Sequence, residues 1–135
     1  MVQAEIWKLL GNKGDKISFI VADGSTIEVG DFLELADPMT VTAHSTNDDT
    51  PIVGIAFEKK LANDGKVLIT GITNCIFKAT IDAGGTCTIG DLVSMGTTAG
   101  KVEIGAATDF ETGWTVGRAY ESATAGETGL FKSTF

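Results

Sequence analysis

One short pattern, V-G-x-A-[FY]-E, occurs twice in this chain. It reads Val53-Gly54-Ile55-Ala56-Phe57-Glu58 and, 63 residues later, Val116-Gly117-Arg118-Ala119-Tyr120-Glu121. A second match lies upstream of each copy, where Gly30-Asp31 and Gly90-Asp91 stand 60 residues apart and both lead into apolar residues. Ordered matches at nearly equal spacing are the signature of a repeated structural unit. The sequence therefore predicts two related β units, at about 17–71 and 76–135.

The repeated pattern has the alternation of a β-strand, because successive side chains of a strand point to opposite faces. Each copy places its larger side chains on one face and Gly and Ala on the other. Arg118 stands where the first copy has Ile55, so that face of the second copy is less apolar. The expected core of the repeat consists of Val53, Phe57, Val116 and Tyr120.

The composition favours an all-β fold. The chain has 135 residues with 17 Gly and 2 Pro, and interior glycines cost a long helix about 1 kcal/mol each. Short strands between Gly-containing turns indicate a small barrel or a compact sandwich. We expect an N-terminal arm and linker at 1–16 and a single all-β domain at 17–135. Strands are predicted near 17–21, 26–29, 32–36, 40–43, 52–58, 66–70, 73–81, 86–89, 92–95, 101–104, 114–121 and 129–133.

The chain is acidic and its acid is unevenly placed. Asp and Glu number 18 against 10 Lys and Arg, and residues 23–49 hold seven carboxylates without a Lys or Arg. Binding to nucleic acid or to an anionic membrane depends on basic residues, so both are disfavoured. Because unpaired carboxylates are costly to bury, the 23–49 segment is expected to lie mainly at solvent, or to face a basic partner or a bound cation.

No pattern of catalytic, cofactor-binding or metal-binding residues was found. His44 is the only histidine, and it is expected to be a solvated loop residue. Cys75 and Cys87 are too few for a four-ligand zinc site and are expected to be small core residues rather than a disulfide. No targeting or membrane segment is recognised. The expectation is a protein that is not an enzyme and has no cofactor and no metal.

The N-terminal arm is the expected partner-binding element. It is rich in apolar residues that a partner would cover, since a free apolar arm promotes aggregation. Pairing with a sheet edge would satisfy its backbone, and Trp7 is the best anchor because Trp is enriched at interface hot spots. Alternatively, the arm is the first strand of its own barrel. The arm residues in question are Val2, Ile6, Trp7, Leu9 and Leu10.

These features together resemble the capsid decoration, or cement, proteins of tailed double-stranded DNA viruses, of the β-tulip type to which the head protein D of phage lambda belongs. The resemblance is carried by Val29–Leu33, Ile89–Val93 and the two V-G-x-A segments. It implies a β-tulip-like fold and a structural bacteriophage protein that forms homotrimers on the lattice of the major capsid protein. It also implies synthesis in the host cytoplasm, a place on the outer capsid surface of the virion, and stabilisation of the capsid.

Two other function classes stay open at this point. One is a receptor- or glycan-binding head-fibre or tail domain, in which Trp7 and Trp114 are candidate sugar platforms. The other is an enzyme or an accessory domain of one. Co-purification with shells in a large, fixed copy number distinguishes a cement protein from both.

Overall fold

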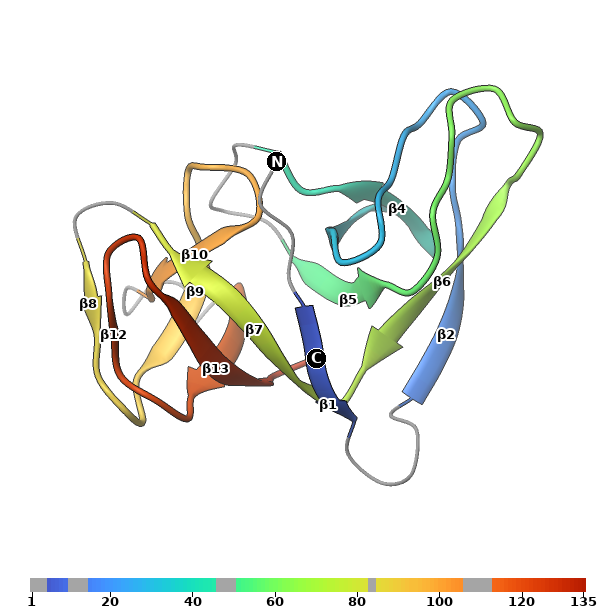
Figure 1. Ribbon diagram of the computed structural model, residues 1–135. Helices are drawn as coiled ribbons and strands as arrows, with labels where there is room; N and C mark the ends of the chain where they lie inside the picture. Colours follow the sequence, from blue (N-terminus) through green and yellow to red (C-terminus); the bar gives the residue numbers. More distant parts are fainter. Residues whose placement is uncertain (1–4, 10–14, 46–50, 83–84, 106–112) are drawn as a thin grey trace.

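The computed structural model describes residues 5–9, 15–45, 51–82, 85–105 and 113–135, and all their regular structure is β (Figure 1). Among these residues no helix is long and apolar enough to cross a membrane. The strands are β1 (Glu5–Leu9), β2 (Asp15–Ile20), β3 (Phe32–Asp37), β4 (Thr40–Ala43), β5 (Ile52–Ala56), β6 (Leu68–Thr73), β7 (Cys75–Ile81), β8 (Thr86–Cys87), β9 (Leu92–Met95), β10 (Lys101–Ile104), β11 (Thr115–Ala119), β12 (Ala123–Thr124) and β13 (Thr128–Ser133).

The strands form two small barrels that lie side by side (Figure 1). The first barrel closes in the order β2-β4-β3-β5-β6. The second runs β7-β10-β9-β11-β13 and closes through pairing of β13 with β7. The two orders are the same, strand for strand. Both also include one parallel contact, between β2 and β4 in the first barrel and between β7 and β10 in the second. The predicted all-β fold of two related units is confirmed.

The registers fix which residues of the two barrels are equivalent. Ile20 pairs with Leu68 in the first barrel as Thr80 pairs with Thr128 in the second. The repeated V-G-x-A segments are β5 and β11, and each skips a residue against its neighbour strand, at Val53 and Val116 respectively. These two valines are therefore equivalent bulge residues. The equivalent of a first-barrel residue is called its twin below.

The Gly-Asp motif is the same turn in both barrels. Gly30 and Gly90 both have φ 92°, a left-handed conformation that glycine adopts without steric cost. The following Asp31 and Asp91 each accept a hydrogen bond at Oδ2, from the N–H of Glu28 and of Thr88, both at 2.9 Å. This shared turn chemistry explains why the motif is readable in the sequence.

The face by which the first barrel packs on the second is apolar. Phe32 meets Phe77 edge to face with ring centroids 5.5 Å apart, and three isoleucines of the first barrel belong to the same buried cluster as the core of the second. Their twins on the second barrel are half-buried or exposed, and most of them are polar. The four pairs of twins are Phe32 and Leu92, Ile52 and Thr115, Ile55 and Arg118, and Ile72 and Lys132.

The expected repeat core is only partly right. Val116 is buried and Val53 is half-buried, but Phe57 and Tyr120 are 46% and 50% exposed. Both aromatic residues follow the last residue of their strand, Ala56 or Ala119. The alternation that would have turned them inward ends with these alanines. The bulge at Val53 or Val116, four residues before each aromatic residue, has already shifted the alternation.

His44 was expected in solvent, but it is buried. Its N–H donates to the carbonyl of Phe32 at 2.8 Å, which extends the β3–β4 pairing beyond Ala43. Burial lowers the pKa of its imidazole. Cys75 and Cys87 are free and buried, as expected, and burial raises the pKa of both thiols.

Candidate interaction surface

The twin barrels provide an internal comparison, because the same backbone carries two different surfaces. The first barrel exposes Ile20, Met39 and Leu68 to 47%, 51% and 54%. Ile20 and Leu68 are cross-strand neighbours, and the N–H of Ile20 donates to the carbonyl of Met39 at 2.7 Å. We call these three residues the Ile20 patch. Their twins are Thr80, Gly100 and Thr128, so the barrel itself does not require apolar side chains there.

Met39 is also held in a costly backbone conformation. Its φ is 54°, and its twin Gly100 has φ 74°. A non-glycine residue in the left-handed region costs about 1 kcal/mol or more relative to glycine. The first barrel thus bears a side chain that its backbone disfavours and that points to no core. This combination indicates a role for the Met39 side chain outside the barrel.

A protruding lobe distinguishes the first barrel further. The lobe consists of residues 21–30 and 57–67, which connect β2 to β3 and β5 to β6 (Figure 1). Its inner contact is the bridge between Ile27 and Lys60, whose twin is the β8–β12 pair of Cys87 with Ala123. The stretch from Lys60 to the start of β6 is three residues longer than the stretch from Ala123 to the start of β13. This insertion changes the spacing between equivalent residues of the two barrels from 63 to 60.

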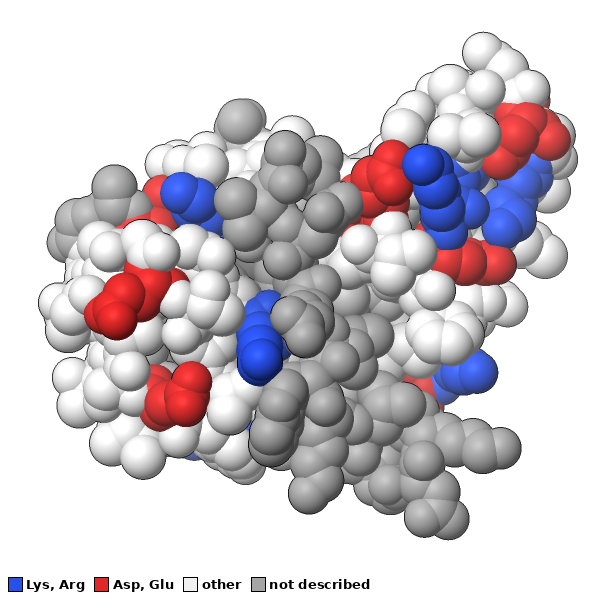
Figure 2. All heavy atoms as spheres, in the orientation of Figure 1, with Lys and Arg blue, Asp and Glu red and all other residues white. Residues whose placement is uncertain are grey.

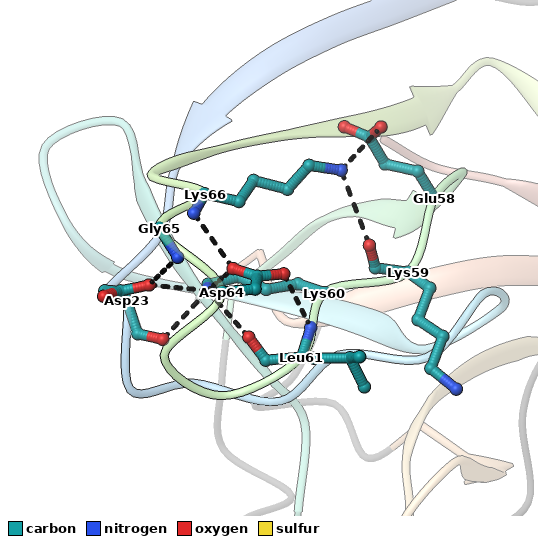
Figure 3. A network of polar contacts seen from close by, with 8 residues as sticks. All are labelled: Asp23, Glu58, Lys59, Lys60, Leu61, Asp64, Gly65 and Lys66. Carbon is teal, nitrogen blue, oxygen red and sulfur yellow. Dashed lines mark hydrogen bonds and ion pairs between the residues drawn. The ribbon is translucent and has the colours of Figure 1, made fainter.

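Charged side chains of both signs gather on this lobe (Figure 2). At its centre the side chain of Lys60 is fully buried. Its Nζ lies 2.7 Å from Oδ1 of Asp64 and 3.4 Å from Oδ1 of Asp23, and it donates to the carbonyls of Asp23 and Leu61 at 2.9 and 3.1 Å (Figure 3). A buried ammonium group is tolerated only when it is paired and hydrogen-bonded, and this one is.

The carboxylates complete the lobe's two turns. Asp64 accepts the backbone N–H groups of Leu61 and Lys66, at 3.0 and 2.9 Å, and Asp23 accepts that of Gly65 at 2.7 Å (Figure 3). A second ion pair joins Lys66 to Glu58 at 3.0 Å. The network therefore fixes the three-residue insertion as a rigid projection rather than a loose loop.

The electrostatics of the network follow from these contacts. Burial by itself lowers the pKa of Lys60, but the hydrogen bonds to Asp64 and Asp23 outweigh it and the pKa is raised. The hydrogen bond from Lys60, followed by the N–H of Lys66, lowers the pKa of Asp64 to about 2. The hydrogen bond from Lys66 likewise lowers the pKa of Glu58. All three groups are charged at neutral pH.

The acidic 23–49 segment divides between solvent and turns. Asp23 and Asp37 are exposed, and Glu28 and Glu34 are half-buried. Asp31 is the buried exception among the described carboxylates of this segment, because it caps the Gly30 turn. Asp48 and Asp49 lie outside the described residues. No group of three or more His, Cys, Asp or Glu side chains with the geometry of a metal site occurs in the described part of the chain.

The described part of the arm pairs with the second barrel. Ile6, Trp7 and Leu9 belong to β1, which pairs antiparallel with β7 of its own chain, whereas Val2 and Leu10 lie outside the described residues. Docking of a partner through this arm stays a prediction. The second tryptophan, Trp114, is half-buried just before β11.

Sequence reasoning missed the Ile20 patch and Lys60. Both differ from their twins, so a residue-by-residue alignment of the two units at the 60- and 63-residue spacings would have found Lys60 and two residues of the patch. Such an alignment sets Ile20 and Leu68 against Thr80 and Thr128, and Lys60 against Ala123, whereas the equivalence of Met39 and Gly100, at a spacing of 61, follows only from the strand registers.

Comparison with known proteins gives one informative result. No family model and no curated protein matches the chain. Among solved structures, it is similar to the N base of head fibre gp8.5 of bacteriophage phi29, with a TM-score of 0.52 and 12% sequence identity over 89% of this chain and 93% of that one. At this identity the likeness shows a shared fold. The matched protein belongs to a phage head, whereas nothing in the comparison supports the specific type of lambda head protein D.

Proposed function

We propose that this chain is a non-enzymatic structural protein of a phage virion that binds the outside of the head. The observation that carries the proposal is the fold, which it shares over nearly its whole length with the base of a phage head fibre. The proposal agrees with the resemblance to capsid decoration proteins that the Gly-Asp turns and V-G-x-A strands carry. It also agrees with an acidic chain that is poorly suited to bind nucleic acid.

In this role the protein acts through the interface it adds. A stable protein–protein contact buries about 1,600 Å² in total, with a small apolar centre inside a polar rim. The Ile20 patch provides an apolar centre, and the charged lobe beside it provides a rim of fixed geometry. Many copies on one lattice bind with avidity, so that shell expansion must break many contacts together.

Two forms of the role are proposed in order. The first is a cement protein, a homotrimer on the lattice of the major capsid protein that stabilises the shell. The second is the base of a receptor- or glycan-binding head fibre, which the head-fibre neighbour favours. The two differ in what the particle loses without the protein: resistance to heat or pressure in the first case, and a projecting fibre in the second.

The test uses purified shells that lack the protein and recombinant full-length chain. We expect co-sedimentation that saturates at a fixed copy number, and a trimer by sedimentation equilibrium. Met39→Gly is expected to weaken binding without unfolding the barrel. Ile89→Ser is the matched control, because Ile89 and its twin Val29 are both exposed and thus not specific to the first barrel. Absence of saturable binding to shells would contradict the proposal.

A further inference from the structure

Among the described residues, the first barrel has a sheet edge without a partner strand where the second barrel carries a bound strand. In the second barrel, β1 covers the edge of β7, with Glu5 opposite Lys78 and Leu9 opposite Cys75. The twin of this stretch is Asp15–Ser18 of β2. On that side β2 pairs with β4 at Ile20 alone, and no strand among the described residues pairs with Asp15–Phe19 there.

The backbone groups of this edge are aimed outward. The N–H of Val21 donates to Val67 beyond β6, and the N–H of Ile20 donates to Met39 on the opposite side. Because backbone groups alternate along a strand, Lys16 and Ser18 present their N–H and C=O groups to the open edge. Their twins Ile76 and Lys78 present the same groups to β1.

Exposure marks the same stretch independently. All four residues Asp15–Ser18 are exposed, whereas their twins in β7 alternate between buried and half-buried. Ile17 is 38% exposed, although its twin Phe77 is fully buried in the core of the second barrel. Exposed strand edges are normally protected because they pair with other chains. This edge instead has an exposed isoleucine on it and the Ile20 patch at its end.

The equivalent edge of the second barrel shows what kind of group fits here. The charge of the first barrel shows what kind of protein supplies it. The group is an extended strand, as β1 is. A second copy of this chain is a poor source, because its β1 is engaged on its own β7 and the corresponding face of its second barrel carries Arg118 and Lys132 in place of isoleucines. Residues 15–73 hold ten Asp and Glu against four Lys, so the first barrel carries a net charge of −6 and favours a basic segment.

We propose that β2 accepts, antiparallel to itself and opposite Asp15–Ser18, an extended basic segment of another protein with apolar side chains at alternate positions. This recognition is strand addition, in which main-chain hydrogen bonds give affinity and alternate side chains give specificity. It deepens the proposed function and rests on it in one respect: the segment belongs to the shell.

A peptide tests the edge without shells. The probe is an acetylated, amidated peptide of residues 3–11 with Glu5→Lys, since the parent strand already fits the equivalent edge. On titration into the full-length protein, we expect amide exchange at Lys16 and Ser18 to slow by about tenfold or more. Ser18→Pro is expected to abolish binding, because it removes an outward N–H while leaving the β2–β6 hydrogen bonds intact. Ser18→Ala, the matched control, is expected to bind normally.

Other outcomes overturn the inference. Slowed exchange at Ile76 and Lys78 instead would mean strand exchange on β7, and self-association abolished by Ser18→Pro would make the occupant a second copy. Measurements of binding to shells distinguish this inference from the proposed function. Equal binding of shells by the Ser18→Pro and Ser18→Ala proteins overturns the edge as the docking element and leaves the proposed function standing. A wild-type protein that binds the peptide at β2 but no shells contradicts the proposed function alone.

Discussion

Gly71 lies directly against the ring of Phe19 inside the first barrel, where an added Cβ would stand 2.9 Å from Cε2 of Phe19. The twins reverse the sizes: Ala79 replaces Phe19 and Phe131 replaces Gly71. At this pair of positions, each barrel thus has one large side chain, contributed by one of two neighbouring strands. Interiors are close-packed, so these choices are coupled.

This relationship predicts a rescue. Phe19→Ala is expected to destabilise the protein by about 3–5 kcal/mol, as for other buried Phe truncations. Adding Gly71→Phe reproduces the arrangement of the second barrel and is expected to recover more than 1 kcal/mol as coupling between the two sites. Urea unfolding of the four proteins in the cycle measures this coupling. Additive losses would show that the barrels do not share one packing solution.

The contact between the barrels predicts an asymmetric response to exchange of twins. Ile55→Arg places a charge in the buried contact and is expected to cost about 3 kcal/mol or more. Arg118→Ile changes an exposed residue whose Nη1 donates to the carbonyl of Gly90 at 2.8 Å, and is expected to change stability by less than about 1 kcal/mol. Thermal melts of the two variants provide the test; equal losses would argue against the assigned contact.

Lys60 is expected to be the residue on which the lobe depends. Lys60→Met removes the donor that joins both turns of the lobe, and we expect a loss of about 1–3 kcal/mol because acceptors are left without it. Lys59→Met is the control: Lys59 is half exposed, and its ion pair with Glu28 at 3.4 Å contributes little. Amide exchange of Leu61, Gly65 and Lys66 should quicken in the first variant only.

The pKa of Asp64 predicts a window of acid destabilisation. Its value is lowered to about 2 from an ordinary 3.8, so the folded state binds this proton less tightly than the unfolded state does. The corresponding stability is present above about pH 4 and is lost as the pH falls towards 2. Asp64→Asn should flatten this part of the stability–pH curve. Carboxyl chemical shifts that titrate near 4 in the folded protein would contradict the expectation.

Met39 is expected to oppose stability and favour docking. Met39→Gly relieves the left-handed strain at φ 54° and should raise stability by about 1 kcal/mol. The same change deletes an exposed side chain of the Ile20 patch and should weaken shell binding. Calorimetry and co-sedimentation measure the two effects. A variant that is more stable and binds equally well would show that the Met39 side chain does not contribute to docking.

The repeat was predictable because its defining residues are dictated locally. Gly30 and Gly90 must adopt a positive φ, and Asp31 and Asp91 must cap the turn, so the same letters recur. The burial of Phe57 and Tyr120 was mispredicted because it depends on where a strand ends and where a bulge falls. The covered face around Ile55 was not predictable either, because covering it requires a barrel distant in sequence.

The contact between the barrels also disfavours head-to-tail association of separate molecules. A head-to-tail interface that does not close on itself generates filaments. The apolar face of the first barrel is used up within the chain, and the matching face of the second barrel carries Arg118 and Lys132. Leu92→Phe, Thr115→Ile, Arg118→Ile and Lys132→Ile together would restore that face. A protein so altered would present an apolar face to other molecules and is expected to self-associate.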